Sequence, residues 1–128
     1  MMKKSLPKIS DSEFEVMKII WETNPVRAKQ INELLSPKKD WTEQTIKTLI
    51  NRLLKKDAIS FKKEGRTYLY YPLINEKDYI NRESKSFLQK FYDGSLNAMF
   101  SYFIKDKSLS KSDIEELKKL LDEGTEND

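Results

Sequence analysis

The stretch Asp40-Trp41-Thr42-Glu43-Gln44-Thr45-Ile46-Lys47-Thr48-Leu49-Ile50-Asn51-Arg52-Leu53-Leu54-Lys55-Lys56 decides the fold of this chain. From Ile46 onward its apolar residues recur at i, i+3, i+4, i+7 and i+8, which predicts an amphipathic helix from about Thr42 to Lys56. At 100° per residue, these apolar residues lie within about 80° of Ile46 on a helical wheel. One face of this helix can therefore be buried, while amides, hydroxyls and cations cover the opposite face.

The polar face has the chemistry of a helix that reads the major groove of DNA. Gln44, Thr48, Asn51 and Lys55 lie on the far side of the wheel, and Thr45, Lys47 and Arg52 flank them. Amides suit adenine, Arg and Lys suit guanine, and the Thr methyl group suits thymine. The residues nearest the helix start, Gln44, Thr45 and Thr48, are the best candidates for base contacts, and Thr42 with nearby backbone N–H groups can hold a phosphate. A solvent-exposed face without a partner is the plainer alternative.

After this helix the periodicity changes to two, which predicts a β-hairpin. Ile59 and Phe61 alternate with polar residues, Glu64-Gly65 provides a turn, and the segment 66–71 is rich in β-formers before Pro72. The cations at the end of the helix and beside the turn have the position expected for phosphate contacts, which fix register rather than sequence. They are Lys55, Lys62, Lys63 and Arg66.

Two helices are predicted before the groove-reading helix. Ser10 and Glu13 form a capping box at the start of the first, which ends at Asn24-Pro25. The second places Ile31, Leu34 and Leu35 inward and is expected to end near Ser36-Pro37. Three helices followed by a hairpin is the order of a winged helix-turn-helix, which we prefer to a generic small α+β domain.

The segment after Pro72 is helical and unusually apolar on one side. We expect helices to begin at the caps Asn75 and Ser110, with a break at Gly94 between them and a polar tail from Gly124. Its apolar positions are Ile80, Phe87, Leu88, Phe91, Leu96, Met99, Phe100, Phe103, Ile114, Leu117 and Leu121. About 50 residues are too few to bury such stripes alone, so the segment either folds onto the front half or pairs with a second subunit. We favour a homodimer, which also supplies two groove-reading helices; a ligand pocket is the alternative.

The predicted fold class is therefore mainly α with a small β wing. Residues 1–73 form a winged-helix DNA-binding domain, and residues 74–128 form a helical dimerisation domain. Charge is divided in the same way, because residues 1–73 hold 15 Lys and Arg against 9 Asp and Glu, whereas residues 74–128 hold 9 against 12. A basic front half suits a polyanion, although a solvated surface with uneven charge is the alternative.

Composition excludes several functions. The chain has no Cys and no His, which removes the usual zinc ligands, the commonest general base and thiolate nucleophiles. We therefore expect no metal, no cofactor and no enzymatic activity. No apolar run reaches the roughly 18 residues of a membrane span, and the basic start is not followed by an apolar stretch, so we expect a cytoplasmic protein without membrane insertion.

These residues together resemble the penicillinase-repressor family, the Bla and Mec regulators of β-lactam resistance. The matching pieces are Ile9-Ser10, Glu13–Trp21, Asp40-Trp41-Thr42, Lys47–Leu53, Tyr70-Tyr71, Ser84–Phe87, Ser95–Asn97 and Ile114–Leu117. The resemblance implies a dimeric repressor that binds palindromic operators and blocks β-lactamase or penicillin-binding-protein genes. It also implies relief of repression by cleavage in the dimerisation domain, through a membrane sensor protease that responds to β-lactams.

Two residues depart from the family pattern. Gln44 stands where the members compared carry Lys, which puts the operator preference in doubt. The family's Asn-Phe cleavage bond falls here on Tyr102-Phe103, and only Phe103 fits. Two alternatives stay open: a repressor of this family that controls a metal or stress regulon, and a winged-helix protein-interaction module. The absence of Cys argues against the family's copper-responsive branch.

Overall fold

The computed structural model describes residues 6–126, so the basic start Met1–Ser5 and the end Asn127–Asp128 lie outside the described residues. The elements in chain order are α1 (Asp11–Glu22), α2 (Ala28–Lys39), α3 (Glu43–Lys55), β1 (Ile59–Glu64), β2 (Thr67–Pro72), α4 (Glu76–Tyr92), α5 (Leu96–Lys105) and α6 (Lys111–Glu126). The predicted fold class, mainly α with a small β wing, is confirmed. The chain divides into two compact units, and the boundary along the sequence falls between Ile80 and Asn81.

The start of α1 is fixed by the predicted capping box. The backbone N–H of Glu13 donates to the Ser10 hydroxyl at 3.1 Å, and the Ser10 N–H donates to the Glu13 carboxylate at 2.8 Å. Both contacts satisfy backbone donors that the first turn of a helix leaves free.

Helix α2 is longer than the sequence indicates. It continues through Pro37 to Lys39 and ends at Asp40, whose φ of 44° is left-handed. The expected stop near Ser36-Pro37 is therefore wrong. Proline in the last turn forfeits a single backbone hydrogen bond, and its fixed φ is already helical, so the helix can finish its turn.

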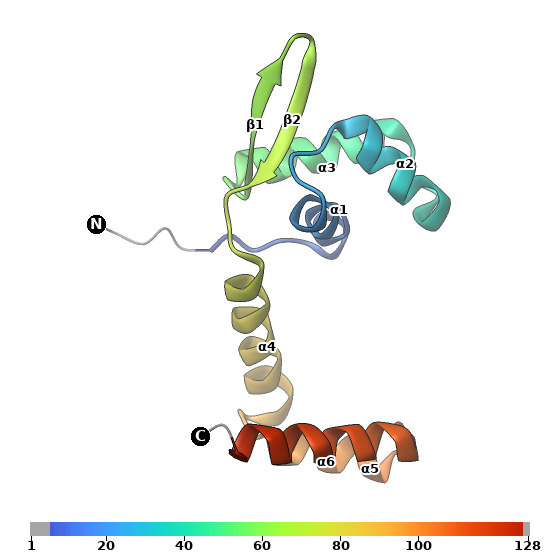
Figure 1. The fold of residues 1–128 in the computed structure, drawn as a ribbon, viewed down its shortest axis with the longest axis vertical. Coiled ribbons are helices and arrows are strands. Elements are labelled where there is room, and N and C mark those ends of the chain that lie inside the picture. Colours follow the sequence, from blue (N-terminus) through green and yellow to red (C-terminus); the bar gives the residue numbers. More distant parts are fainter. Residues whose placement is uncertain (1–5, 127–128) are drawn as a thin grey trace, which may run out of the picture. The chain divides into compact units, whose positions relative to one another are not determined.

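The hairpin joins the helices through a long-range bridge. Strands β1 and β2 are antiparallel, in a register that pairs Phe61 with Tyr70 and Lys63 with Tyr68. Val26, between α1 and α2, adds a one-residue bridge: its N–H donates to the Tyr70 carbonyl at 2.9 Å, and the Tyr70 N–H donates back at 2.7 Å. Figure 1 shows the hairpin projecting from the three helices as a wing.

The core of the first unit is continuous. Its buried members are Ile9, Val16, Met17, Ile20, Val26, Ile31, Leu35, Ile46, Leu49, Ile50, Leu53, Ala58, Ile59, Tyr70 and Tyr79. Four of them, Ile46, Leu49, Ile50 and Leu53, form the inward face predicted for α3, which α1 and α2 cover. Leu54, the fifth residue of the predicted apolar face, is half-buried against the same core, so that face is used in packing, while most of the polar face is exposed.

The first turn of α4 belongs to the first unit. The Tyr79 ring lies 6.0 Å from the Phe14 ring and 5.9 Å from the Trp21 ring, measured between centroids. The Trp21 indole N–H also donates to the Ile74 carbonyl at 3.0 Å. These contacts explain why Tyr79 is buried although its chain neighbours Asp78 and Ile80 are exposed.

The second unit contains the rest of α4 together with α5 and α6. Gly94, with a φ of 82°, separates α4 from α5, and the predicted cap at Ser110 is present, since the Asp113 N–H donates to its hydroxyl at 3.0 Å. Helix α6 continues through Gly124 to Glu126, so the polar tail predicted from Gly124 is helical as far as Glu126 and does not fray there as expected.

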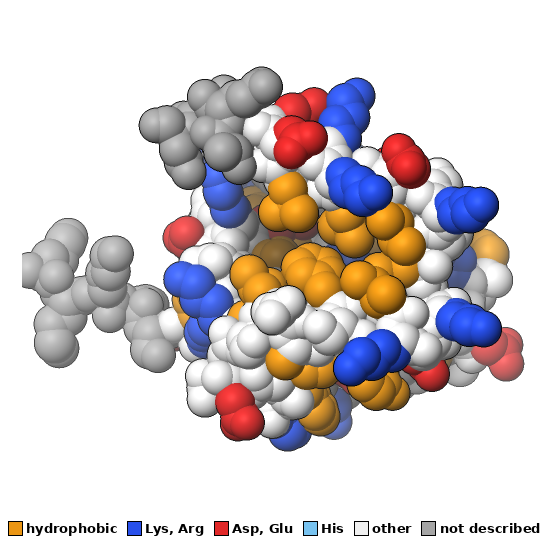
Figure 2. Space-filling view, turned by 90° about the horizontal axis from the view of Figure 1, so that it is seen from below, with side chains coloured by type: hydrophobic (Ala, Val, Ile, Leu, Met, Phe, Trp, Pro, Cys, Tyr) orange, Lys and Arg blue, Asp and Glu red, His pale blue; other side chains and the backbone are white. Residues whose placement is uncertain are grey.

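None of the side chains described between Asn81 and Gly124 is buried. Figure 2 looks onto this unit and shows hydrophobic side chains gathered in the middle of one face, with charged side chains around them. No helix among residues 6–126 is both long and apolar enough to cross a membrane.

Candidate nucleic-acid interface

The start of α3 is held by two threonines. The Thr42 hydroxyl caps the helix, accepting from the Thr45 N–H at 3.1 Å, and the two hydroxyl oxygens also lie 3.1 Å apart. Both side chains are exposed. Thr42 therefore has a structural task in the first turn, and the helix start keeps other backbone N–H groups that can meet an anion.

The predicted polar face of α3 is largely open. Gln44, Thr45, Lys47, Asn51, Arg52 and Lys55 are exposed, whereas Thr48 is half-buried. The Thr48 hydroxyl donates to the Gln44 carbonyl at 2.9 Å. Its proton is thus used within the helix, which leaves the methyl group and an acceptor lone pair for a ligand.

The end of α3 is anchored by an ion pair that sequence reasoning missed. Lys56 donates to the Lys8 carbonyl at 2.8 Å and to the carboxylate of Glu13, which is only 2% exposed. Burial opposes ionisation of Glu13, but the hydrogen bonds from Lys56 and from the Ser10 backbone lower its pKa overall. No local sequence pattern predicts this ion pair, because its two residues lie 43 positions apart.

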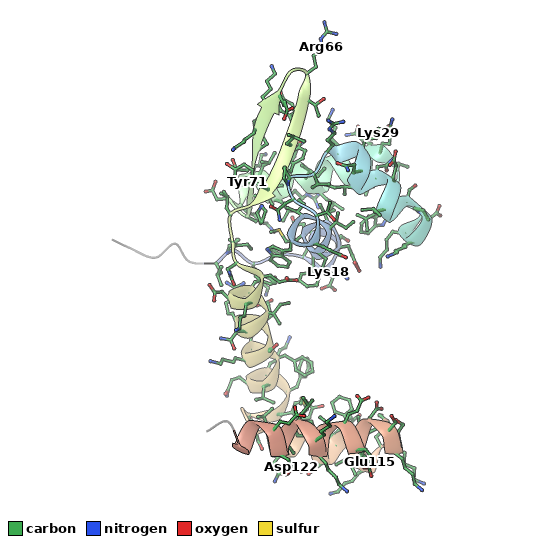
Figure 3. The ribbon with its side chains drawn as sticks, viewed as in Figure 1. Lys18, Lys29, Arg66, Tyr71, Glu115 and Asp122 are labelled. Carbon is green, nitrogen blue, oxygen red and sulfur yellow. The ribbon has the colours of Figure 1, made fainter. Side chains whose placement is uncertain are left out.

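The wing presents the three predicted cations. Lys62 and Lys63 lie on β1 and are exposed, and Arg66 follows Gly65, whose φ of 64° suits the tight turn. Figure 3 shows Arg66 at the tip of the hairpin. Successive strand residues point to opposite faces, so Lys62 and Lys63 lie on different faces of the wing. The ammonium of Lys63 lies 6.0 Å from the Tyr68 ring centroid.

A groove separates the wing from the helices. It measures about 660 Å³ and is lined by the start of α2, one flank of α3 and the aromatic face of the wing. Lys29, at the start of α2 in Figure 3, and Lys47 and Asn51, on α3, lie along it. The sequence prediction did not single out Lys29, although a cation at the start of the helix preceding a groove-reading helix was an available signal, since that helix crosses the DNA backbone.

The residues predicted for dimerisation gather in the second unit, apart from Ile80, which ends the first. Ile80, Phe87, Phe91, Leu96 and Leu121 are exposed, whereas Leu88, Met99, Phe100, Phe103, Ile114 and Leu117 are half-buried. The exposed fraction reaches 60% for Phe91 and 66% for Leu121. Large apolar side chains with that exposure mark a face that lacks its cover within one chain.

Tyr102 and Phe103, the predicted cleavage pair, lie in the second half of α5. Tyr102 is 56% exposed and Phe103 is half-buried, with 5.6 Å between their ring centroids. Among residues 6–126, no group of three or more carboxylate, Cys or His side chains is arranged to hold a metal ion.

Comparison with known sequences places the chain in a family. The model of the penicillinase repressor family matches residues 9–123. The chain is 43% identical over 120 residues to the penicillinase repressor of Bacillus licheniformis, covering 94% of each chain. It is 41% identical over 114 residues to the methicillin resistance regulatory protein MecI of Staphylococcus aureus, covering 89% of this chain and 93% of that one.

Solved structures agree with these sequence matches. The DNA-binding domain of the repressor BlaI is 44% identical, with a TM-score of 0.54 over 61% of this chain and 95% of that domain. The monomeric form of Bacillus licheniformis BlaI in complex with the blaP half-operator is also 44% identical, with a TM-score of 0.53 and the same coverage. The family is one of transcriptional repressors, which is not an enzyme class. This chain, with its α3 helix, its wing and its helical second unit, therefore belongs to the penicillinase repressor family.

Proposed function

We propose that this chain is a sequence-specific transcriptional repressor of β-lactam resistance genes, which acts as a homodimer on a palindromic operator in the cytoplasm. The observation that carries the proposal is the open polar face of α3 beside a basic wing, in a chain 43% identical to a penicillinase repressor. We infer no enzymatic activity, since a sequence without His or Cys lacks the usual general base and nucleophiles.

Base reading falls to side chains on the polar face of α3. Gln44 lies in its first turn and can pair with adenine through both amide atoms. Arg52 can reach guanine from the flank of the same face. The half-buried Thr48 offers its methyl group to thymine, because its hydroxyl proton is occupied by the Gln44 carbonyl. Thr45 completes this reading set.

Phosphate contacts fall to the cations around that face. Lys47 and Lys55 flank it on α3, and Lys62, Lys63 and Arg66 extend from the wing. Such contacts hold the register of a protein on DNA but do not distinguish sequences. The N-terminus of α3, capped by Thr42, adds backbone donors for one more phosphate.

Dimerisation is supported by the state of the second unit. Its described side chains are exposed or half-buried, and apolar residues gather on one face. A second copy of the chain offers the same face and can cover it by two-fold pairing. Two copies would also present two α3 helices to the two halves of a palindrome. A protein-interaction module without DNA binding finds less support, because the outward face of α3 is polar and cationic.

Relief of repression by proteolysis is the remaining part of the proposal. Cleavage between Tyr102 and Phe103 would cut α5 and remove part of the apolar face, which would weaken the dimer. Losing one of two linked binding events can cost about 10²–10⁴ in avidity without changing a DNA contact. Mass spectrometry of the chain recovered from β-lactam-treated cells should find a fragment ending at Tyr102, and an intact chain in derepressed cells would contradict this step.

The decisive experiment for DNA binding is a gel shift with the blaP half-operator duplex and a scrambled duplex of equal length, across a salt series. We expect about tenfold or greater preference for the half-operator, because each mismatched base pair costs about 1–3 kcal/mol. The affinity should also fall as salt rises, since phosphate contacts release counterions. Binding without dependence on salt would refute the proposal, and equal affinity for both duplexes would refute recognition of this half-operator.

A further inference from the structure

The groove between the wing and the helices has an apolar wall and a cationic rim. The wall is formed by Phe61 and Tyr68 of the wing, and its floor by residues of α3 such as Ile50. Phe61 is 42% exposed and Tyr68 is 43% exposed, and their rings meet edge to face at 4.7 Å. This edge-to-face pair helps to hold the hairpin, and it still leaves apolar ring surface open toward the groove, where an apolar part of a ligand can pack.

The charge along the groove favours an anionic occupant. Lys29 and Lys47 line it, and Lys63 lies over the Tyr68 ring at its wing side. Glu43 is the acidic residue among the lining side chains, and its carboxylate accepts from the Asn32 amide at 3.5 Å. Three cations against one carboxylate make the rim attractive to a phosphate chain.

The geometry of duplex DNA provides such a chain at this place. The major and minor grooves of B-DNA are separated by a single sugar–phosphate strand at each edge. If α3 enters the major groove and the wing tip at Arg66 reaches the neighbouring minor groove, that strand must run between α3 and the wing. The space between α3 and the wing is the groove that Lys47 and Tyr68 line from its two sides.

We propose that this groove seats one sugar–phosphate strand of the operator, with Phe61 and Tyr68 packed against deoxyribose and Lys29 and Lys47 bound to phosphates. The inference rests on the proposed DNA-binding function and adds an apolar sugar contact to it. Half or more of the hydrogen bonds between proteins and DNA go to phosphate and sugar. A binding site for one backbone strand would therefore fix how deeply α3 enters the major groove of the DNA.

Hydroxyl-radical footprinting of the blaP half-operator tests the sugar contact, because cleavage reports the exposure of each deoxyribose. The wild-type chain should protect a short run on one strand, beside the bases that α3 covers. Phe61→Leu and Tyr68→Leu should restore cleavage there while the other protected positions stay protected. They should also lower affinity for half-operator and scrambled duplexes alike, by about fivefold.

The matched control is Tyr71→Leu. Tyr71 lies on the same strand as Tyr68 but on the opposite face of the wing, since strand residues alternate, and it pairs with Ser60. It carries the same ring and the same substitution, so it should leave the footprint unchanged. Thermal unfolding of all three variants excludes a loss of folding as the cause.

Neutral methylphosphonate groups, placed one at a time along the protected strand, test the phosphate contacts. A methylphosphonate that weakens DNA binding by the wild-type chain should not weaken binding further in the variant that lacks the matching cation, Lys29→Gln or Lys47→Gln. Each of these variants should also lower the slope of log affinity against log salt concentration by about 0.9. Glu43→Gln should strengthen binding about two- to fivefold, since it removes a like charge from the rim. Lys18→Gln, on the outer side of α1, is the charge control.

The outcomes separate the inference from the function on which it rests. Binding to the half-operator with unchanged footprints in both aromatic variants would overturn the seat and leave repression intact; the groove would then be free for a small ligand or another protein. Absence of any binding by the wild-type chain would overturn both. Loss of one strand's protection in the aromatic variants alone supports the seat.

Discussion

The ammonium of Lys56, which follows the last turn of α3, donates a hydrogen bond to the carboxylate of Glu13 in the first turn of α1. The same ammonium donates to the Lys8 carbonyl at 2.8 Å. The helix that we propose for base reading is therefore tied at its end to the N-terminal segment and to the cap of α1. This ion pair therefore contributes to the stability of the fold and also fixes the position of the helix proposed to contact DNA.

Breaking the pair from one side should be costly. Lys56→Met leaves a buried carboxylate without its cation, and we expect a loss of about 1–3 kcal/mol in the free energy of unfolding. The double variant Glu13→Gln with Lys56→Met should recover part of the loss, because Gln can keep the capping box with Ser10. Urea denaturation of the three chains measures this, and a double variant less stable than Lys56→Met would contradict it.

The same pair predicts a dependence on pH. The pKa of Glu13 is lowered in the folded chain from its ordinary value of 4.5, so the folded state favours the ionised carboxylate. The stability that this provides is present above pH 4.5 and is lost as the pH falls through the lowered pKa. Urea denaturation between pH 7 and pH 3 should show a smaller loss of unfolding free energy in the double variant than in the wild-type chain. Parallel curves of unfolding free energy against pH would contradict the assignment to Glu13.

Base reading and phosphate contact should separate in mutants. Arg52→Ala and Thr48→Ala should weaken binding to the half-operator by about 1–3 kcal/mol and hardly change binding to a scrambled duplex. Lys63→Ala should weaken both alike and reduce the salt slope by about one. Thr48→Val keeps a methyl group and loses the hydroxyl, so it should resemble the wild-type chain. Equal losses on both duplexes in all of these variants would contradict the division.

Gln44 should influence which operator is preferred. An amide pairs best with adenine, whereas the Lys that the family resemblance implies at this position would suit guanine or phosphate. Gln44→Lys should therefore change the preferred base at one operator position by about 1–3 kcal/mol. Selection of bound sequences from a randomised duplex, performed with both chains, compares the two preferences; identical selected sites would rule out a reading role for this residue.

Disrupting the exposed apolar face should separate the subunits. Phe91→Glu or Leu121→Glu places a charge in the proposed interface, and we expect monomers in analytical ultracentrifugation. Affinity for a full palindrome should fall by about 10²–10⁴, while affinity for the half-operator stays unchanged. Lys119→Glu, exposed on the other side of α6, changes the charge without touching that face. A dimer that persists in the Glu variants would contradict this interface.

Much of this architecture follows from local sequence patterns. The capping box at Ser10, the period of α3 and the alternation in the wing each depend on residues a few positions apart, and each is found as predicted. The bridge between Val26 and Tyr70 and the pair between Lys56 and Glu13 join residues more than 40 positions apart. Their formation depends on how the helices pack, which no local pattern encodes. Pro37 shows the converse: a strong local signal is overridden because it falls in a last turn that can spare one hydrogen bond.

The second unit, in which no described side chain between Asn81 and Gly124 is buried, has a consequence for gene dosage. If two copies must meet to cover the apolar face, folding of this unit becomes a bimolecular event. At low chain concentration the concentration of dimer would then vary with the square of the rate of repressor synthesis, so that halving this rate would reduce the dimer concentration about fourfold. A cell could thus leave the repressed state through a modest fall in repressor level, and the response would have a threshold that a monomeric repressor lacks.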